Sequence, residues 1–174
     1  ALLAIQTCWT GTARELLDLT SRVLAIARPA GVKVLVNDRA DVALACGAHG
    51  VHLRADGVPT ARVRRLAPPA FLIGRSVHTP AEAAAASGAG ADYLIAGTVL
   101  PTPSKPGASR YLGFEGLRSV AIASSVPVLA IGGMTRASIA DVGRAGAAGI
   151  AAVGLFCEGG AQAVDVAATI RESR

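Results

Sequence analysis

Short apolar segments alternate with amphipathic segments along the whole of this 174-residue chain, and this alternation constrains its fold more than any other feature. The apolar segments are rich in Val, Ile, Leu and Ala and have the length of buried strands, whereas the segments between them show helical periodicity. The expected strands cover residues 2–6, 32–36, 49–53, 71–74, 93–96, 127–131 and 149–153. The expected helices cover 12–27, a short stretch ending at 44, 59–66, 80–87, 114–123, 136–144 and 161–171. Strict alternation of strands and helices predicts an α/β fold with a parallel sheet.

Three glycine-containing segments of similar sequence each link a helix end to the next strand, which indicates one repeated architecture. They cover residues 46–51, 88–93 and 145–150. Seven β-α units in so few residues favour a closed (β/α)8 TIM barrel short of one unit over an open sheet. The chain starts at Ala1 directly on an apolar segment, so we expect the first, N-terminal unit to be absent from this numbering. Residues 1–174 are thus predicted to form a single TIM-barrel domain.

Composition narrows the classes of function. Hydrophobic residues make up 52% of the chain and charged residues 17%, which suits a folded domain with a sizeable core. The formal net charge is +5, yet the arginines are scattered and no basic run is interleaved with aromatic residues. We therefore expect a small phosphorylated ligand and no nucleic acid. The three cysteines form no Cys-x-x-Cys pair, which argues against a disulfide scaffold or a zinc site.

Hydropathy gives no sign of a membrane protein. No apolar run reaches the roughly 18 residues that cross a bilayer, and no basic-then-apolar leader is found. We expect a cytoplasmic protein with no membrane partner. The sequence leaves open whether it forms a homo-oligomer.

Glycines follow the last two expected strands, at Gly132, Gly133 and Gly154. In a (β/α)8 barrel the loops after the seventh and eighth strands form a phosphate site, because bare backbone amides and a helix N-terminus attract an anion. We expect these three glycines to bind phosphate; the alternative is that they only form tight turns.

Polar side chains gather just after the strand at 71–74, where a parallel barrel places its catalytic groups. Ser76 and His78 lie there, and a neutral imidazole transfers protons near pH 7. Lys105, one of two lysines, lies in the next long loop and either binds a phosphate or is a solvated loop cation. We expect Ser76, His78 and Lys105 to be catalytic. His49 and His52 lie at the start and in the body of a strand, so we expect both to be structural.

Asn37 and Asp38 follow the strand at 32–36, and Asp56 follows the next strand. Asp38 either binds Mg²⁺ or caps the following helix, and the pattern does not choose between these roles. Asp56 is the only candidate for a second carboxylate. A strong magnesium site is not indicated.

Taken together, several motifs resemble the superfamily that joins thiamine phosphate synthase to the TenI-like thiazole tautomerases. The motifs are Val36-Asn37-Asp38-Arg39, Gly50-Val51-His52-Leu53, Gly74-Arg75-Ser76-Val77-His78-Thr79, Pro101-Thr102-Pro103-Ser104-Lys105-Pro106 and Ala130-Ile131-Gly132-Gly133-Met134-Thr135. The resemblance implies a TIM barrel that acts on a phosphorylated thiazole, with Gln6, Asn37, Thr102 and Ser104 as substrate-binding residues. It also implies that Asp38, with Asp56 in place of a shifted second carboxylate, binds Mg²⁺ if the protein is a synthase.

The two branches of the superfamily predict different chemistry for this chain. Synthases carry Gln-Leu-Arg-Glu-Lys where this chain has Gln6-Thr7-Cys8-Trp9-Thr10, so both cations that hold the pyrophosphate are missing. They also carry an Asp at the position of Gly57. His78 matches the proposed acid/base of the tautomerases, which need no cofactor. We therefore expect a thiazole tautomerase. A magnesium-dependent thiamine phosphate synthase and a catalytically degenerate thiazole-phosphate-binding protein remain the alternatives.

Overall fold

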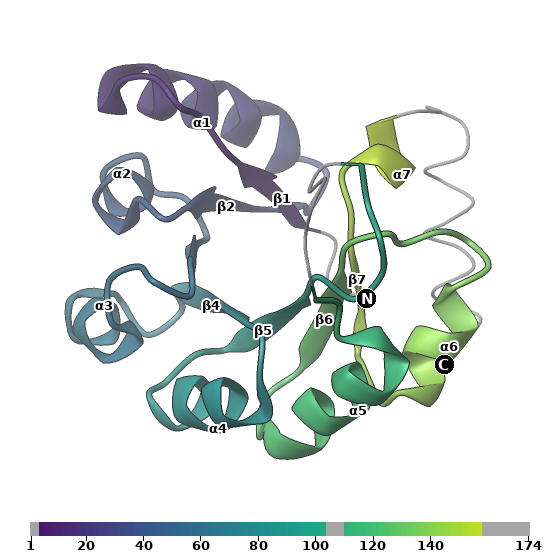
Figure 1. Ribbon diagram of the computed structural model, residues 1–174. Coiled ribbons are helices and arrows are strands. Elements are labelled where there is room, and N and C mark those ends of the chain that lie inside the picture. Colours follow the sequence, from purple (N-terminus) through teal and green to yellow (C-terminus); the bar gives the residue numbers. More distant parts are fainter. Residues whose placement is uncertain (1–3, 104–109, 158–174) are drawn as a thin grey trace. The chain divides into compact units, whose positions relative to one another are not determined.

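A computed structural model describes residues 4–103 and 110–157 of the chain (Figure 1). The chain divides into two compact units. The first unit comprises Ala1–Ser76 and Ala89–Asp92, and the second comprises Val77–Gly88 and Tyr93–Arg174. The helix expected at 161–171 lies outside the described residues. No helix of the described part is both long and apolar enough to cross a membrane.

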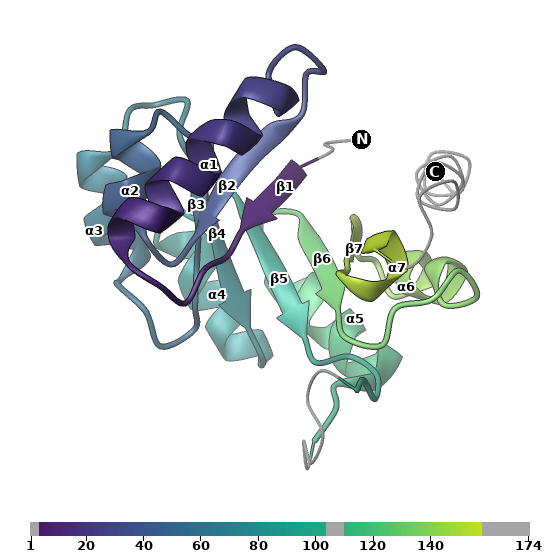
Figure 2. The same ribbon diagram turned by 90° about the horizontal axis from the view of Figure 1, so that it is seen from above.

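The first unit alternates four strands with three helices. They are β1 (Ala4–Thr7), α1 (Ala13–Ala27), β2 (Lys33–Asn37), α2 (Ala40–Ala45), β3 (Gly50–Leu53), α3 (Thr60–Leu66) and β4 (Leu72–Val77). Each strand pairs in parallel with the next, so the strand order follows the sequence. The three helices cover the same side of these strands (Figures 1 and 2). This arrangement brings the carboxyl ends of all four strands to one edge of the sheet.

The core of the first unit forms where apolar helix faces meet the strands. Val34, Val51 and Ile73 from three neighbouring strands are fully buried, and Leu16 and Val63 come from α1 and α3. The helix α1 begins with a capping box, in which the Thr12 hydroxyl accepts from the Glu15 amide and the Glu15 carboxylate accepts from the Thr12 amide. This reciprocal cap satisfies two donors that a helix start leaves unpaired.

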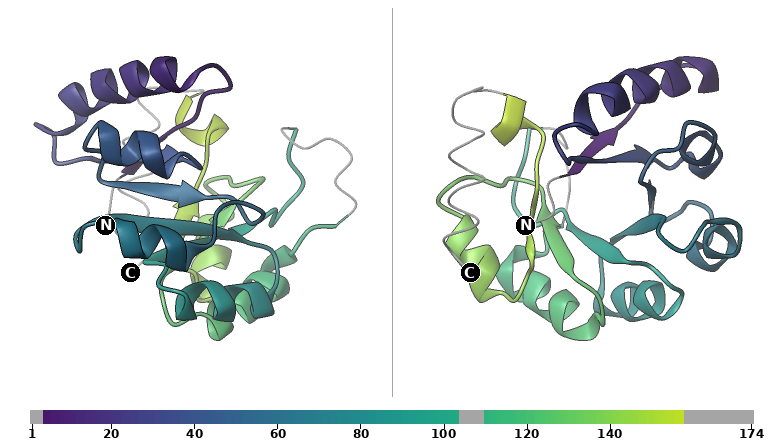
Figure 3. Two further views of the ribbon diagram at one scale, coloured as in Figure 1. Left: turned by 90° about the vertical axis from the view of Figure 1, so that its left-hand side faces the viewer. Right: turned by 180° about the vertical axis from the view of Figure 1, so that it is seen from behind.

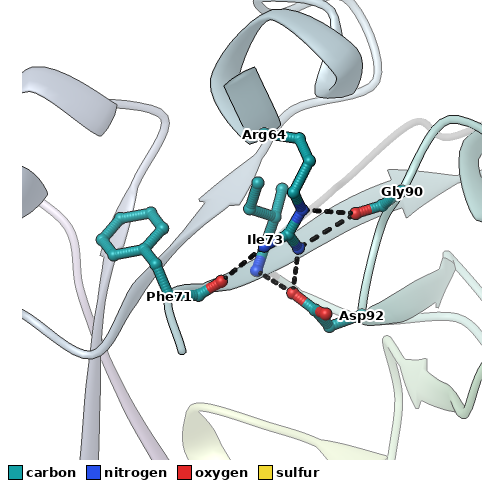
Figure 4. Close-up of polar contacts among 5 residues, drawn as sticks. All are labelled: Arg64, Phe71, Ile73, Gly90 and Asp92. Carbon is teal, nitrogen blue, oxygen red and sulfur yellow. Dashed lines mark hydrogen bonds and ion pairs between the residues drawn. The ribbon is translucent and has the colours of Figure 1, made fainter. Parts of the chain in front are cut away.

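Arg64 of α3 ties the unit together near the amino end of β4 (Figure 4). Its guanidinium donates to the carbonyls of Phe71 (2.9 Å) and Gly90 (3.0 Å) and pairs with the Asp92 carboxylate. The same carboxylate accepts from the Ile73 amide at 2.7 Å. Because Gly90 and Asp92 follow α4, these bonds fix that segment beside α3 and β4.

The described part of the second unit continues the alternation with three strands and four helices. They are α4 (Pro80–Gly88), β5 (Tyr93–Gly97), α5 (Gly113–Ala123), β6 (Val128–Ile131), α6 (Ile139–Arg144), β7 (Gly149–Ala151) and α7 (Gly154–Cys157). β5, β6 and β7 are parallel and follow one another in the sheet. α4, α5 and α6 lie along one side of these strands (Figure 3). Leu94, Leu117, Val120 and Val142 are buried between the helices and the strands.

Three elements differ most from the sequence prediction, and β7 also ends at Ala151, two residues before the predicted end at 153. β4 extends three residues beyond Gly74 to Val77, because Arg75 continues the pairing with Leu53 of β3. α6 begins at Ile139 instead of residue 136, because the Ser138 hydroxyl bonds the backbone of Thr135 and forms a turn there. α7 was not expected from the sequence. The extended β4 matters most, because it places Ser76 inside a strand.

Candidate functional site

Polar side chains lie side by side at the carboxyl ends of β1 and β2. The Gln6 side-chain amide donates to the Asn37 side-chain oxygen at 2.8 Å. The adjacent Thr7 is buried and its hydroxyl bonds the Thr20 hydroxyl and the Leu35 carbonyl, so Thr7 is a packing residue. Two of the predicted substrate-binding residues, Gln6 and Asn37, are thus brought together at the strand edge where ligands bind in parallel α/β proteins.

In the loop after β1, Cys8 and Thr10 stand where the synthase motif has its two cations, and Trp9 lies between them. The Trp9 side chain is about half exposed, at 52%, and its indole N–H donates to the Glu15 carboxylate at 3.2 Å. The bonds from Thr12 and Trp9 lower the pKa of Glu15. The loop is therefore anchored to the first turn of α1, and it contributes no positive side chain.

His52 and Ser76 form a hydrogen-bonded pair between β3 and β4. The Nε2 atom of His52 lies 2.9 Å from the Ser76 Oγ atom. In the parallel register His52 pairs with Gly74, so Ser76 stands two residues further along β4 on the same face. His52 is 3% exposed, and burial, followed by the charge of Arg75, lowers its pKa to about 4. The imidazole is therefore neutral near pH 7.

Arg75, between Gly74 and Ser76, holds the loop that follows β3. Its guanidinium donates to the carbonyls of Val58 at 2.6 Å and Ala55 at 2.7 Å. These two bonds fix the segment 55–58 against the end of β4. The loop that the family resemblance links to metal binding is thus shaped by a residue of the neighbouring strand.

Asp38 has an unusual backbone conformation at the end of β2, with a φ angle of 57°. Its amide donates to the His52 carbonyl at 2.8 Å, and its carboxylate accepts from the Arg54 amide at 3.3 Å. The residue before α2 is Arg39, and that helix has no side-chain cap. Of the two predicted roles for Asp38, helix capping is therefore wrong, and its carboxylate lies instead at the ends of β2 and β3.

One carboxylate at this edge, that of Asp38, fits a magnesium site, whereas that of Asp56 does not take part in it. Asp56 is paired with the Arg54 guanidinium at 2.8 Å, and its side chain is 72% exposed. A Cβ atom at Gly57 would lie 2.5 Å from the Asp38 carboxylate, so Asp38 occupies the space of a side chain at that position. Within the described ranges no three His, Cys, Asp or Glu side chains cluster as metal ligands. Mg²⁺ is commonly held by one or two carboxylates together with substrate phosphates, and Asp38 meets that requirement.

His78 lies near the start of the second unit, two residues before α4 begins at Pro80. Its backbone amide donates to the Glu82 carboxylate at 2.7 Å, and its Nδ1 atom lies 3.3 Å from the same carboxylate. The Thr79 hydroxyl accepts from the Glu82 amide at 3.1 Å, so this group of contacts caps the helix. The side chain of His78 is 50% exposed. The contact between His78 and Glu82 is therefore explained by capping of α4, and it needs no catalytic role.

The glycines after β6 allow two loops to approach each other closely. Gly132 and Gly133 have φ angles of 97° and 67°. A Cβ atom on Gly132 would lie 2.4 Å from the Thr98 side chain, and one on Gly133 would lie 2.5 Å from the Pro101 carbonyl. Side chains are thus excluded at both positions, and the backbone is left bare.

Other predicted site residues are located only in part. Thr102 follows β5 and is half-buried, and Gly154 is exposed at the first residue of α7. Ser104 and Lys105 lie outside the described residues. The sequence predicted a structural role for His52. In the structure its side chain contacts Ser76, which the sequence predicted to be catalytic.

Comparison with known proteins identifies relatives along most of the chain. A family model described as thiamine monophosphate synthase matches residues 7–156. The thiamine-phosphate synthase of Methanoculleus marisnigri is 42% identical over 161 residues, which cover 92% of this chain and 74% of that protein. The thiamine-phosphate synthase of Roseiflexus sp. strain RS-1 is 45% identical over 141 residues, covering 81% of this chain and 60% of that protein. The chain thus spans about two thirds of the length of these relatives.

Solved structures confirm the predicted α/β barrel class. The thiamine phosphate pyrophosphorylase from Pyrococcus furiosus superposes with a TM-score of 0.85 at 33% identity, covering 98% of this chain and 83% of that one. A 3-hexulose-6-phosphate synthase superposes with a TM-score of 0.71 at 20% identity, covering 98% of this chain and 86% of that one, a likeness of fold alone. The parallel strands that alternate with helices in both units agree with this class.

Proposed function

This chain belongs to the thiamine monophosphate synthase family, and from that membership we propose that it is a thiamine-phosphate synthase. In the reaction that we propose, a pyrimidine pyrophosphate and a thiazole phosphate are joined to give thiamine phosphate and pyrophosphate. The observation that carries the proposal is the identity of 42% and 45% to two relatives that both bear this name.

The relatives favour the synthase over the tautomerase that the sequence led us to expect. The tautomerase interpretation rested on the two missing cations after β1 and on His78. His78 has a carboxylate partner that also caps α4, which gives that pair a structural reason to exist. The missing cations remain a difference from the synthase motif. If the chain is a synthase, neutral hydrogen-bond donors at the neighbouring strand ends must supply more of the contacts to the pyrophosphate.

In the proposed site, the pyrophosphate end of the substrate lies at the ends of β3 and β4. The Ser76 hydroxyl donates to a phosphate oxygen there. Asp38 would hold Mg²⁺, which when bound supplies positive charge to the pyrophosphate and so favours its departure. Gln6 and Asn37 offer amide donors and acceptors that suit the edge of a pyrimidine ring.

The thiazole phosphate is assigned to the second unit. The bare backbone of Gly132 and Gly133 gives an anion close access to main-chain amides. Gly154, Thr102 and Ser104 are proposed as further contacts to the thiazole phosphate. Lys105, which lies outside the described residues, is proposed to bind a phosphate group as a point charge.

The experiment is to incubate the protein with pyrimidine pyrophosphate and thiazole phosphate, with Mg²⁺ or with EDTA, and to measure thiamine phosphate. A parallel NMR assay follows isomerisation of the thiazole carboxylate phosphate. We expect magnesium-dependent thiamine phosphate formation that Asp38→Asn abolishes. Asp56→Asn is the matched control and should keep most activity, because Asp56 is exposed and paired with Arg54. Isomerisation that persists in EDTA and stops in His78→Ala, without thiamine phosphate formation, would restore the tautomerase interpretation.

A further inference from the structure

The His52–Ser76 pair combines one buried ring with one half-buried hydroxyl. The ring of His52 is 3% exposed and its Nε2 atom lies 2.9 Å from the Ser76 oxygen. A serine hydroxyl has one proton to donate and two lone pairs that accept. If that proton is donated to His52, none is left for an anion. The direction of this one bond therefore decides whether Ser76 binds a phosphate oxygen.

We propose that His52 is a positioning residue whose Nε2–H donates to Ser76 Oγ, so that the Ser76 proton is directed to a pyrophosphate oxygen. The proposal rests on the proposed function, because it takes the pyrophosphate as the anion. Its geometry rests on the register of β3 and β4, in which His52 faces Gly74 and reaches the next side chain of that face.

Two observations support a fixed contact at this place. The His52 ring is 3% exposed and its Nε2 atom lies 2.9 Å from the Ser76 Oγ atom, so the two side chains are held together. The backbone on both sides is fixed, because the His52 carbonyl accepts from the Asp38 amide and Arg75 holds the loop after β3. A hydroxyl whose oxygen is already engaged by a rigid donor loses little rotational freedom on binding an anion.

The test is a double-substitution cycle of His52→Phe and Ser76→Ala, with the affinity for inorganic pyrophosphate measured by calorimetry in Mg²⁺. We expect each single substitution to weaken pyrophosphate binding about 10- to 100-fold, the range for a hydrogen bond to a charged group. His52→Phe should cause no further loss in the Ser76→Ala background, because its effect acts through that hydroxyl. His52→Gln should restore much of the affinity, since its amide nitrogen lies about where Nε2 was.

His49→Gln serves as the matched control. It removes a histidine from the opposite end of β3, where Nδ1 accepts from the Val34 amide, and it should leave pyrophosphate affinity unchanged. ¹⁵N NMR of the wild-type protein should show a protonated Nε2 and an unprotonated Nδ1 for His52. In steady-state kinetics of His52→Phe, the KM for the pyrimidine pyrophosphate should rise above that of the wild-type protein, while the KM for thiazole phosphate stays the same.

Failure of the inference and failure of the proposed function give different results. A wild-type protein that binds pyrophosphate but forms no thiamine phosphate overturns the function, and the cycle on pyrophosphate affinity still decides the role of His52. Equal losses from His52→Phe with and without Ser76, an unprotonated Nε2, or absence of pyrophosphate binding would each overturn the inference.

Discussion

Removing the Arg64 guanidinium should destabilise the first unit by about 2–3 kcal/mol. Arg64→Met keeps most of the aliphatic stem but leaves the Phe71 and Gly90 carbonyls without this donor (Figure 4). Each such bond contributes roughly 1 kcal/mol net. The ion pair with Asp92 adds only about 0.5 kcal/mol, because the two side chains are 29% and 39% exposed and solvent screens them.

Urea unfolding followed by circular dichroism measures this loss, and Arg65→Met is the matched control. Arg65 is the next residue of α3 and is exposed, so its replacement should change the free energy of unfolding by less than about 0.5 kcal/mol. Hydrogen exchange adds a local measurement. The Ile73 amide donates to the Asp92 carboxylate that Arg64 orients, so its protection should fall in Arg64→Met. A loss no larger than that of Arg65→Met, with unchanged Ile73 protection, would refute this account of the Arg64 bonds.

Three further outcomes follow from single contacts. Gly132→Ala should destabilise the protein by more than about 1 kcal/mol and weaken thiazole phosphate binding, measured by urea unfolding and calorimetry, because its φ is 97° and Cβ would lie 2.4 Å from Thr98. Gly143→Ala should instead raise the free energy of unfolding by about 0.5–1 kcal/mol, because this helical glycine has open space around it. Burial lowers the pKa of His49 below 6.5, so the unfolded state binds its proton more readily and stability falls as the pH drops through 6.5. His49→Gln should make that fall shallower between pH 8 and pH 5.5 in urea titrations, and the part due to His52, whose pKa is also lowered, should remain.

The order of elements could be predicted from the sequence because each signal is local. Thr12 and Glu15 stand three residues apart before an apolar periodicity, and this spacing alone predicts where α1 begins. The predicted end of β4 at Gly74 was wrong because it depends on a contact that is not local. Arg75 and Ser76 are polar and therefore indicate a strand end, whereas pairing with β3 extends the strand to Val77. Such pairing depends on a neighbour that is distant in the sequence.

The same limit explains which residues the sequence could propose for the site. Ser76 was proposed because it follows an apolar strand, a position that favours function in a barrel. His52 was not proposed because it lies inside an apolar strand, where a histidine is usually a packing residue. A signal did exist, since residues 50–53 and 72–77 are neighbouring parallel strands in which alternate side chains share a face. Using it requires the register, which places His52 opposite Gly74 and leaves Ser76 within reach.

The choice between synthase and tautomerase depended on how positive charge was counted. Cys8 and Thr10 stand where the synthase motif has its cations, so a count of charges along that one loop argues against a pyrophosphate substrate. Binding of a polyanion also draws on neutral donors and on charge brought by a metal ion, and these come from other strands. Ser76 held by His52, and Asp38 held at the ends of β2 and β3, are such groups. Because they are assembled by the sheet and not by one motif, the loss of cations from one loop does not by itself argue against the proposed synthase reaction.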